Sequence, residues 1–261
     1  MRVFLPRLLN ALLLCGCLAA ATALRSQSTE FPQPQDPGTI SFKVDAFSLG
    51  VAPDESAPNQ YRALVLGNTT AYIGIVNGFD FEIGTQLFVR NTFATNGSDH
   101  TESGIGDVTL RAKWVFLKDG ESREEAAVVP YIVLPTDSNA VGNNAVEGGV
   151  IVPWQVDVTN DFRIGAMAQV DILRNQANTS YTSRLYGSAF AKWKLGQRFG
   201  AYAETTLSDS TAGSGTASGT LGAGATLSLS KDFEWDFEMS RVLGSGRNGW
   251  TEVLRFRWTI L

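Results

Sequence analysis

Apolar and polar residues alternate with a period of two along most of this chain, from Ile40 to its last residue. Successive side chains of a β-strand point to opposite faces, so the pattern predicts strands with one apolar and one polar face. Residues 107–117 show it well, because the apolar side chains share one face there and most polar ones share the other. Twelve such segments are expected, at 40–49, 61–75, 79–93, 107–117, 125–135, 148–158, 162–174, 182–195, 198–207, 219–230, 233–243 and 250–261.

The connections between these segments alternate between short and long. Very short turns such as Asn77-Gly78 and Gly196-Gln197 alternate with longer polar loops such as 94–106 and 136–147. A soluble sandwich would need a second sheet over each apolar face, whereas a barrel in a membrane needs only lipid outside it. The pattern therefore predicts an all-β fold, a single antiparallel transmembrane up-and-down β-barrel of about 12 strands with both termini on the short-turn side.

The first residues predict export. A basic start with Arg2 and Arg7 precedes a short apolar stretch, and Ala21-Thr22-Ala23 has the small-x-small pattern of a signal peptidase site. We expect a signal peptide at 1–23, a flexible periplasmic leader at 24–38 and an outer-membrane β-barrel at 39–261. Leu14-Cys15-Gly16-Cys17 is a loose lipobox, which leaves lipidation of Cys17 as an alternative. The expected location is the outer membrane of a Gram-negative cell, with both termini periplasmic.

Composition narrows the possible functions. The mature chain carries a formal charge of about −7, which argues against nucleic-acid binding. Both cysteines lie before residue 24, so ordinary cleavage would leave no disulfide and no cysteine nucleophile. His100 is the single histidine, and no serine-nucleophile motif or metal-ligand spacing accompanies it. We therefore expect no catalytic residue, no metal, no cofactor and no enzyme activity.

The polar faces should line the lumen and interact across it. A symmetric last hairpin about residues 245–247 would place Glu238 opposite Arg255 and Asp236 opposite Arg257. Such charges either fill and stiffen a narrow lumen or form a lining that selects solutes. The charged side chains expected inside are Asp80, Glu82, Arg90, Arg111, Lys113, Asp157, Arg163, Asp171, Arg184, Lys192, Glu204, Glu234, Asp236, Glu238, Arg255 and Arg257.

Apolar residues interrupt this polar lining. They either plug the barrel or form a path for small apolar or aromatic molecules, and a one-residue slip in register would turn a whole strand over. The inward apolar and aromatic residues expected from the alternation are Phe88, Val115, Tyr131, Met167, Tyr186, Phe190 and Tyr202.

Two glycine- and proline-containing motifs carry a family resemblance. Gly104-Ile105-Gly106-Asp107 leads into the strand at 107–117, and Leu134-Pro135-Thr136 ends the next one. Gly148-Gly149-Val150-Ile151-Val152-Pro153 then begins another strand. In this order and spacing the motifs resemble the outer-membrane transporter family named for the meta-pathway of phenol degradation. The resemblance covers nearly the whole mature chain and implies a barrel that passes small hydrophobic compounds.

The motif residues also have structural explanations. Gly104 and Gly106 permit a sharp entry from loop to strand, and Asp107 could bind loop amides. Pro130, Pro135 and Pro153 each lack a backbone donor, which predicts bulges or a weakened seam between the strands at 125–135 and 148–158. A lateral opening at that seam is the functional alternative.

These patterns favour a channel for small, hydrophobic or aromatic solutes that cross by passive diffusion. The alternative is a structural or surface-binding barrel whose lumen is plugged. The expected partners are outer-membrane lipid, a small-molecule solute and the barrel assembly machinery, with no nucleic acid.

Overall fold

The computed structural model describes residues 29–53, 60–95, 98–137, 141–142, 144–175, 179–210, 218–243 and 249–260. Within these ranges no helix is long and apolar enough to cross a membrane. The strands are β1 (Ile40–Pro53), β2 (Gln60–Val76), β3 (Phe79–Thr95), β4 (Ser98–Gly104), β5 (Val108–Asp119), β6 (Glu124–Leu134), β7 (Glu147–Asp157), β8 (Phe162–Arg174), β9 (Tyr181–Lys194), β10 (Phe199–Ser210), β11 (Ser218–Ser228), β12 (Phe233–Leu243) and β13 (Trp250–Thr259).

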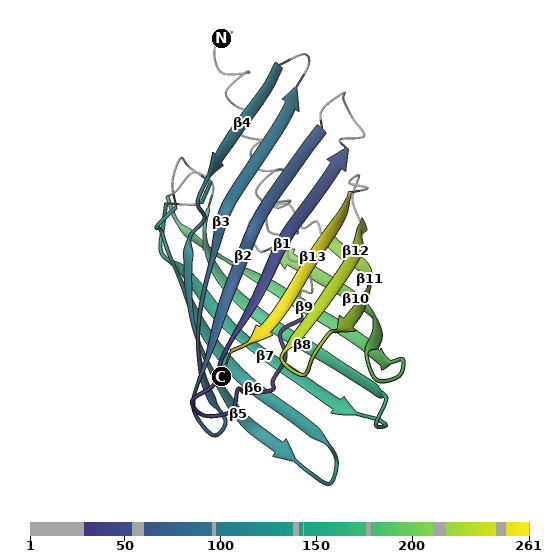
Figure 1. The fold of residues 1–261 in the computed structure, drawn as a ribbon. Helices are drawn as coiled ribbons and strands as arrows, with labels where there is room; N and C mark the ends of the chain where they lie inside the picture. Colours follow the sequence, from purple (N-terminus) through teal and green to yellow (C-terminus); the bar gives the residue numbers. More distant parts are fainter. Residues whose placement is uncertain are drawn as a thin grey trace.

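The strands form one closed antiparallel barrel (Figure 1). β1 pairs with β13 on one side and with β2 on the other, which closes the sheet on itself. β4 pairs with the end of β3 and β5 with its beginning, in the same register, so β4 and β5 share one strand position. The barrel therefore has twelve strand positions, which confirms the predicted fold. The sequence pattern assigned β4 to a loop, because Ser98–Gly104 lacks an apolar face.

The connections are sorted by length between the two ends of the barrel. At one end they span two to four residues, and Gly78 has the positive φ of 77° that its tight turn requires. At the other end they span six to twelve residues, except for the two residues between β3 and β4. Figure 1 shows that β1 begins and β13 ends at the short-turn end.

The outer face of the barrel is apolar. Leu87, Leu207 and Leu221 each expose more than half of their surface. Trp114 and Trp258 are also exposed, close to the short-turn end of their strands. Such an apolar band with aromatic residues near its rim is typical of a barrel wall that contacts lipid.

A bulge in β1 changes which residues face inward. Asp45 pairs with Arg255 and Phe47 pairs with Leu254, so Ala46 is an extra residue relative to β13. On β2, Gly67 lies at the same level and has a φ of 64°. A single extra residue turns every later side chain of a strand to the opposite face.

The effect on β3 corrects one prediction. Glu82 is buried before this level, whereas Val89 and Asn91 are the buried residues after it. Phe88 and Arg90 are exposed on the opposite face. Neither of them therefore lines the lumen, contrary to the simple alternation.

The last hairpin also differs from its predicted register. Asp236 lies opposite Arg255, and Glu234 lies opposite Arg257, two residues away from the predicted pairs. The predicted partner Glu238 still reaches Arg255 diagonally, with 3.7 Å between Oε2 and Nη2. The predicted row of paired charges is present, but the centre of the hairpin lies one residue earlier in the chain than the predicted pairs require.

Candidate functional site

The lumen contains a segment of the chain itself, residues 29–38, here called the plug. Its first residue contacts the wall on β9 and β10. The Thr29 backbone N–H donates to Glu204 Oε1 at 2.7 Å, and its hydroxyl lies 2.5 Å from Ser188 Oγ. Glu204 Oε2 is buried without a hydrogen-bond partner. The plug thus supplies the hydrogen bonds found for a carboxylate that sits deep inside the barrel.

The next plug residue, Glu30, binds two cations on β5. Its Oε1 lies 2.8 Å from Lys113 Nζ and its Oε2 lies 3.3 Å from Arg111 Nη1. Lys113, which is 2% exposed, also lies 3.0 Å from Glu82 Oε1. Burial alone would raise the pKa of the Glu30 carboxyl, but the charges of Lys113 and Arg111 outweigh burial and lower it to about 2.

The plug continues toward β1 along the lumen. The Phe31 ring meets the Phe190 ring edge to face, with 5.1 Å between centroids, and Pro32 is fully buried. Further on, the Gln35 backbone N–H donates to the Asp80 carboxylate at 2.8 Å. The sequence predicts a flexible periplasmic leader at 24–38, and in the structure its residues 29–35 have contacts inside the barrel while 36–38 are exposed next to β1. Their proline-rich sequence has no periodicity that could have indicated this.

A second charge cluster joins β1, β12 and β13. Arg255 Nε lies 2.6 Å from Asp45 Oδ1, and its Nη1 lies 2.8 Å from Asp236 Oδ2. The Tyr202 hydroxyl lies 2.9 Å from Asp236 Oδ1 and 3.1 Å from Glu238 Oε2. Because these side chains belong to β1, β12 and β13, and Tyr202 on β10 reaches them across β11, the cluster ties this side of the wall together. Arg257, predicted in the same lining, is exposed near the end of β13.

A third cluster lies on β6, β8 and β9. Arg184 Nε donates to Asp171 Oδ2 at 2.8 Å, and both Tyr131 and Gln169 also donate to Asp171. Asp171 is fully buried, so its charge is matched by Arg184 and by hydrogen bonds. Of the residues expected in the lining, Tyr131 and Arg184 therefore bind another side chain of the wall, Asp171.

Three of the predicted aromatic residues lie across glycines of the adjacent strand. In each case the glycine is the cross-strand partner, and a Cβ atom there would overlap the aromatic side chain. Each ring therefore lies against the adjacent strand of the wall. The pairs are Tyr131 with Gly149, Phe190 with Gly165, and Tyr202 with Gly224.

An apolar patch lies beside the third cluster. Met167 is buried against Val129 and Ile151, and Tyr131 and Tyr186 pack on this group. The Met167 sulfur also accepts the Glu30 backbone N–H at 3.1 Å. The structure thus brings Met167, Tyr131 and Tyr186 together, all three of which the alternation assigns to the inner face.

The two short motifs meet in space. The Asp107 carboxylate accepts the backbone N–H groups of Thr136, at 2.9 Å, and Asp137, at 3.0 Å. Gly106, which lies between β4 and β5, donates to the Gln86 carbonyl at 2.9 Å, and Gly104 closes the β4 pairing opposite Val89. The predicted role of Asp107 as an acceptor for loop amides is confirmed. Its partners directly follow Pro135.

Pro153 marks a gap in the β6–β7 ladder. The pairs Ala126–Trp154 and Val129–Ile151 flank this gap, and Pro153 lies within it, fully buried. The register is the same on both sides of the gap, so the seam is interrupted without a slip. This agrees with the weakened seam that the prolines predict.

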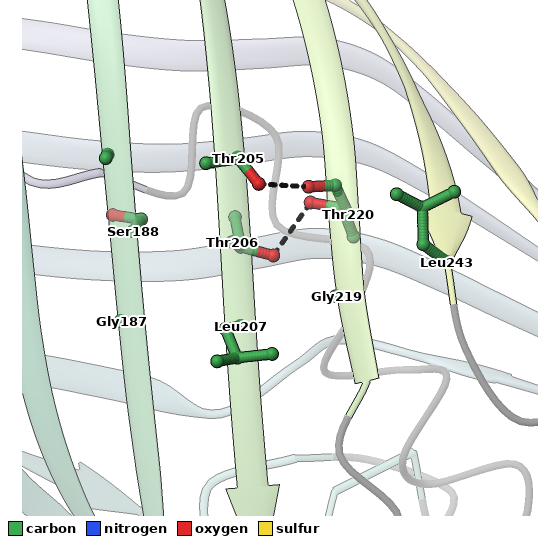
Figure 2. A pocket seen from close by; sticks show the side chains of 9 residues that line it. Gly187, Ser188, Thr205, Thr206, Leu207, Gly219, Thr220 and Leu243 are labelled. Carbon is green, nitrogen blue, oxygen red and sulfur yellow. Dashed lines mark hydrogen bonds between the residues drawn. The ribbon is translucent and has the colours of Figure 1, made fainter.

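A separate groove of about 610 Å³ is lined by residues of β9–β12 (Figure 2). It is hollow because Gly187, Ala189 and Gly219 are small, while Leu207 and Leu243 border it. The hydroxyls of Thr206 and Thr220, which also line it, share a hydrogen bond of 2.7 Å between β10 and β11. None of its lining residues is titratable, so the candidate chemistry remains in the lumen.

The polar groups of the lumen form ion pairs and hydrogen bonds. Across the described ranges no group of three histidine, cysteine or acidic side chains could hold a metal ion. His100 lies on β4, exposed, and contacts Glu102 at 3.1 Å. A general base beside a nucleophile is the usual arrangement for hydrolysis, whereas most charges of the lumen are paired with one another.

Residues 37–260 match the family described as "Putative MetA-pathway of phenol degradation". The chain belongs to this family. The membership agrees with the resemblance carried by the Gly104–Asp107 and Leu134–Thr136 motifs. No curated protein sequence matches the chain significantly.

Solved structures share the fold of this family member. The COG4313 outer membrane channel from Pseudomonas putida F1 has a TM-score of 0.70 at 10% identity, over 90% of this chain and 100% of that chain. The KdgM porin in complex with disordered oligogalacturonate has a TM-score of 0.52 at 11% identity, over 85% and 99%. The CymD monoaromatic hydrocarbon channel has a TM-score of 0.50 at 10% identity, over 86% and 88%. The fold is therefore that of outer-membrane channels and porins.

Proposed function

We propose that this family member is an outer-membrane channel through which small hydrophobic or aromatic solutes cross by passive diffusion. The observation that carries the proposal is the plug itself. An extended peptide with a phenylalanine and a proline lies inside the barrel, in contact with β3, β5, β9 and β10. A lumen that holds such a segment has room for molecules the size of a benzene ring once the segment moves.

The chemistry of the wall supports solutes with apolar surface. Phe190, Met167 and Tyr186 present apolar atoms to the lumen, while most nearby charges are already paired within the wall. An aromatic solute therefore meets apolar contacts and few unpaired charges, which lowers the cost of leaving water. Membership in a family named for phenol degradation, and the likeness of fold to a monoaromatic hydrocarbon channel, support the same class of solute.

The orientation follows from the sorting of the loops. In outer-membrane barrels the short turns face the periplasm and the long loops face outward. Because β1 begins and β13 ends at the short-turn end, both termini of the barrel are assigned to the periplasm. The partners in this assignment are outer-membrane lipid, the barrel assembly machinery and a small solute.

The test is solute entry into lipid vesicles that contain the purified full-length mature protein. Toluene and phenol should enter faster than a sugar of similar size and faster than chloride. Tyr186→Asp should slow the aromatic solutes, because it places a charge in the apolar patch. Tyr181→Asp is the matched control, because Tyr181 is exposed at the start of the same strand. Equal entry of all solutes would contradict selectivity and indicate a simple pore.

The plug also favours a second candidate, a structural or surface-binding barrel with a closed lumen. Its contacts with five strands of the wall are the observation in favour. No solute entry above that of empty vesicles, from protein shown to be folded, would support this candidate and exclude the channel.

A further inference from the structure

Two neighbouring residues of the plug present a carboxylate and a phenyl ring to the wall of the lumen. The Glu30 carboxylate is held by Lys113 at 2.8 Å and by Arg111 at 3.3 Å. The Phe31 ring rests against Phe190, with 5.1 Å between centroids and 82° between the ring planes. Phe190 is itself fixed, because Gly165 opposite it leaves room for its ring. Through these two consecutive plug residues the wall binds an anionic group on β5 and an aromatic ring on β9.

The charge balance at this place depends on the plug. Arg111 and Lys113 carry two positive charges, and Glu82 on β3 and Glu30 of the plug carry two negative ones. Without Glu30 the wall retains one uncompensated positive charge at a site where Lys113 is almost fully buried. Lys43 also attracts the Glu30 carboxylate, and Asp80 interacts with both Lys113 and Glu30.

An uncompensated charge in such a site is costly, so the wall has an electrostatic need for one further carboxylate. Arginine and lysine are the side chains that bind carboxylates most strongly, and arginine offers two parallel donors. An edge-to-face contact with Phe190 adds the preferred geometry of an aromatic pair. A monocarboxylate that carries an aromatic ring would satisfy both requirements.

We propose that Arg111, Lys113 and Phe190 form a binding subsite for aromatic monocarboxylates, which Glu30 and Phe31 occupy as an internal mimic. The inference rests on the proposed channel function and names its solute class more narrowly. Such a solute competes with the plug, because both need the same two cations. Neutral aromatic compounds lack a group that binds the two cations, and aromatic amines are repelled by them.

The test is binding of benzoate to the purified full-length mature protein, measured by calorimetric titration in detergent. Glu30→Gln should tighten benzoate binding about ten-fold, the factor expected if Glu30 fills the subsite nine-tenths of the time. Benzyl alcohol and benzylamine should bind weakly to both forms. Phe190→Leu should weaken binding of benzoate but leave binding of acetate unchanged.

Loss of a cation provides the complementary variant. In the Glu30→Gln background, Lys113→Gln should abolish most benzoate binding. Because Lys113→Gln alone leaves the buried Glu82 with only the more distant Arg111, at 3.8 Å, Lys113→Gln combined with Glu82→Gln serves as a second form that removes one charge of each sign. Unchanged benzoate affinity in Glu30→Gln, or benzyl alcohol that binds as tightly as benzoate, would overturn the subsite.

The two proposals fail in different ways. Toluene entry into vesicles tests the channel, whereas benzoate titration tests the subsite. Toluene entry without any effect of Glu30→Gln on benzoate binding overturns the subsite and leaves the channel standing. Benzoate binding that depends on Lys113, without entry of any solute, supports the subsite and overturns the channel.

Discussion

Tyr202 lies across Gly224 of the neighbouring strand, and its hydroxyl reaches both Asp236 and Glu238. A Cβ atom at Gly224 would overlap the Tyr202 ring. The glycine therefore sets the position of the ring, and the ring in turn positions its hydroxyl beside two carboxylates that Arg255 also binds. A residue without a side chain thus supports a charge cluster that spans four strands.

Replacement of Gly224 should consequently destabilise the barrel. Gly224→Ala is expected to lower the free energy of unfolding by about 1–3 kcal/mol, because Tyr202 must move away from its hydrogen-bond partners. Gly187→Ala is the matched control, since its nearest neighbour would lie 3.7 Å away, at ordinary contact distance. Denaturant unfolding in detergent, followed by tryptophan fluorescence, measures both. Equal effects of the two variants would contradict the role of Gly224.

Arg255 should be the most sensitive charged position of the wall. Arg255→Met leaves Asp45 and Asp236 buried without their cation, which is expected to cost about 3–5 kcal/mol. Arg257→Met, two residues further along the strand and exposed, should have little effect. The measurement is the denaturant midpoint of each folded variant. A midpoint for Arg255→Met close to that of Arg257→Met would show that the cluster adds little to stability.

Most of the barrel could be predicted from sequence because each strand contacts two different environments. The alternation of Leu110 with Arg111 indicates which side of the wall is apolar, and this inference does not depend on which strands pair with one another. Where both faces of a strand are polar, as in β4, the alternation disappears and the sequence predicts a loop. The sequence predicts that Phe88 points inward, because the bulge at Ala46, opposite Gly67, reverses the inward face of β3 without changing its hydrophobic pattern.

The lumen was predictable only in part. Side chains such as Lys113 and Glu204 could be assigned to the lumen from their place in the period-two alternation alone. Their contacts depend on register, and the last hairpin shows how an error of one residue at the turn moves Arg255 from Glu238 to Asp236. The plug could not be found at all, because Glu30 acquires its partners from strands more than 80 residues away.

Asp107 should hold the loop after β6 in place. Asp107→Ala removes the acceptor of two backbone N–H groups, at Thr136 and Asp137, and is expected to cost about 1–3 kcal/mol. Asp107→Asn retains an acceptor oxygen and should lose much less. Amide hydrogen exchange at Thr136 and Asp137 reports the local effect. Unchanged protection of these amides in Asp107→Ala would contradict the contact between the two motifs.

The plug should control passage through the lumen, and a reversible crosslink can test this. The Thr29 and Ser188 hydroxyl oxygens lie 2.5 Å apart, so Thr29→Cys with Ser188→Cys brings two thiols to a separation that suits a disulfide. Both natural cysteines precede residue 24, so a chain cleaved at the expected site would contain only the introduced pair. The oxidised double variant should pass toluene more slowly than the reduced one. Either single variant should be insensitive to reductant, because it cannot form the crosslink. Equal toluene entry before and after reduction, with the crosslink verified by mass, would show that solutes pass while residue 29 stays in place.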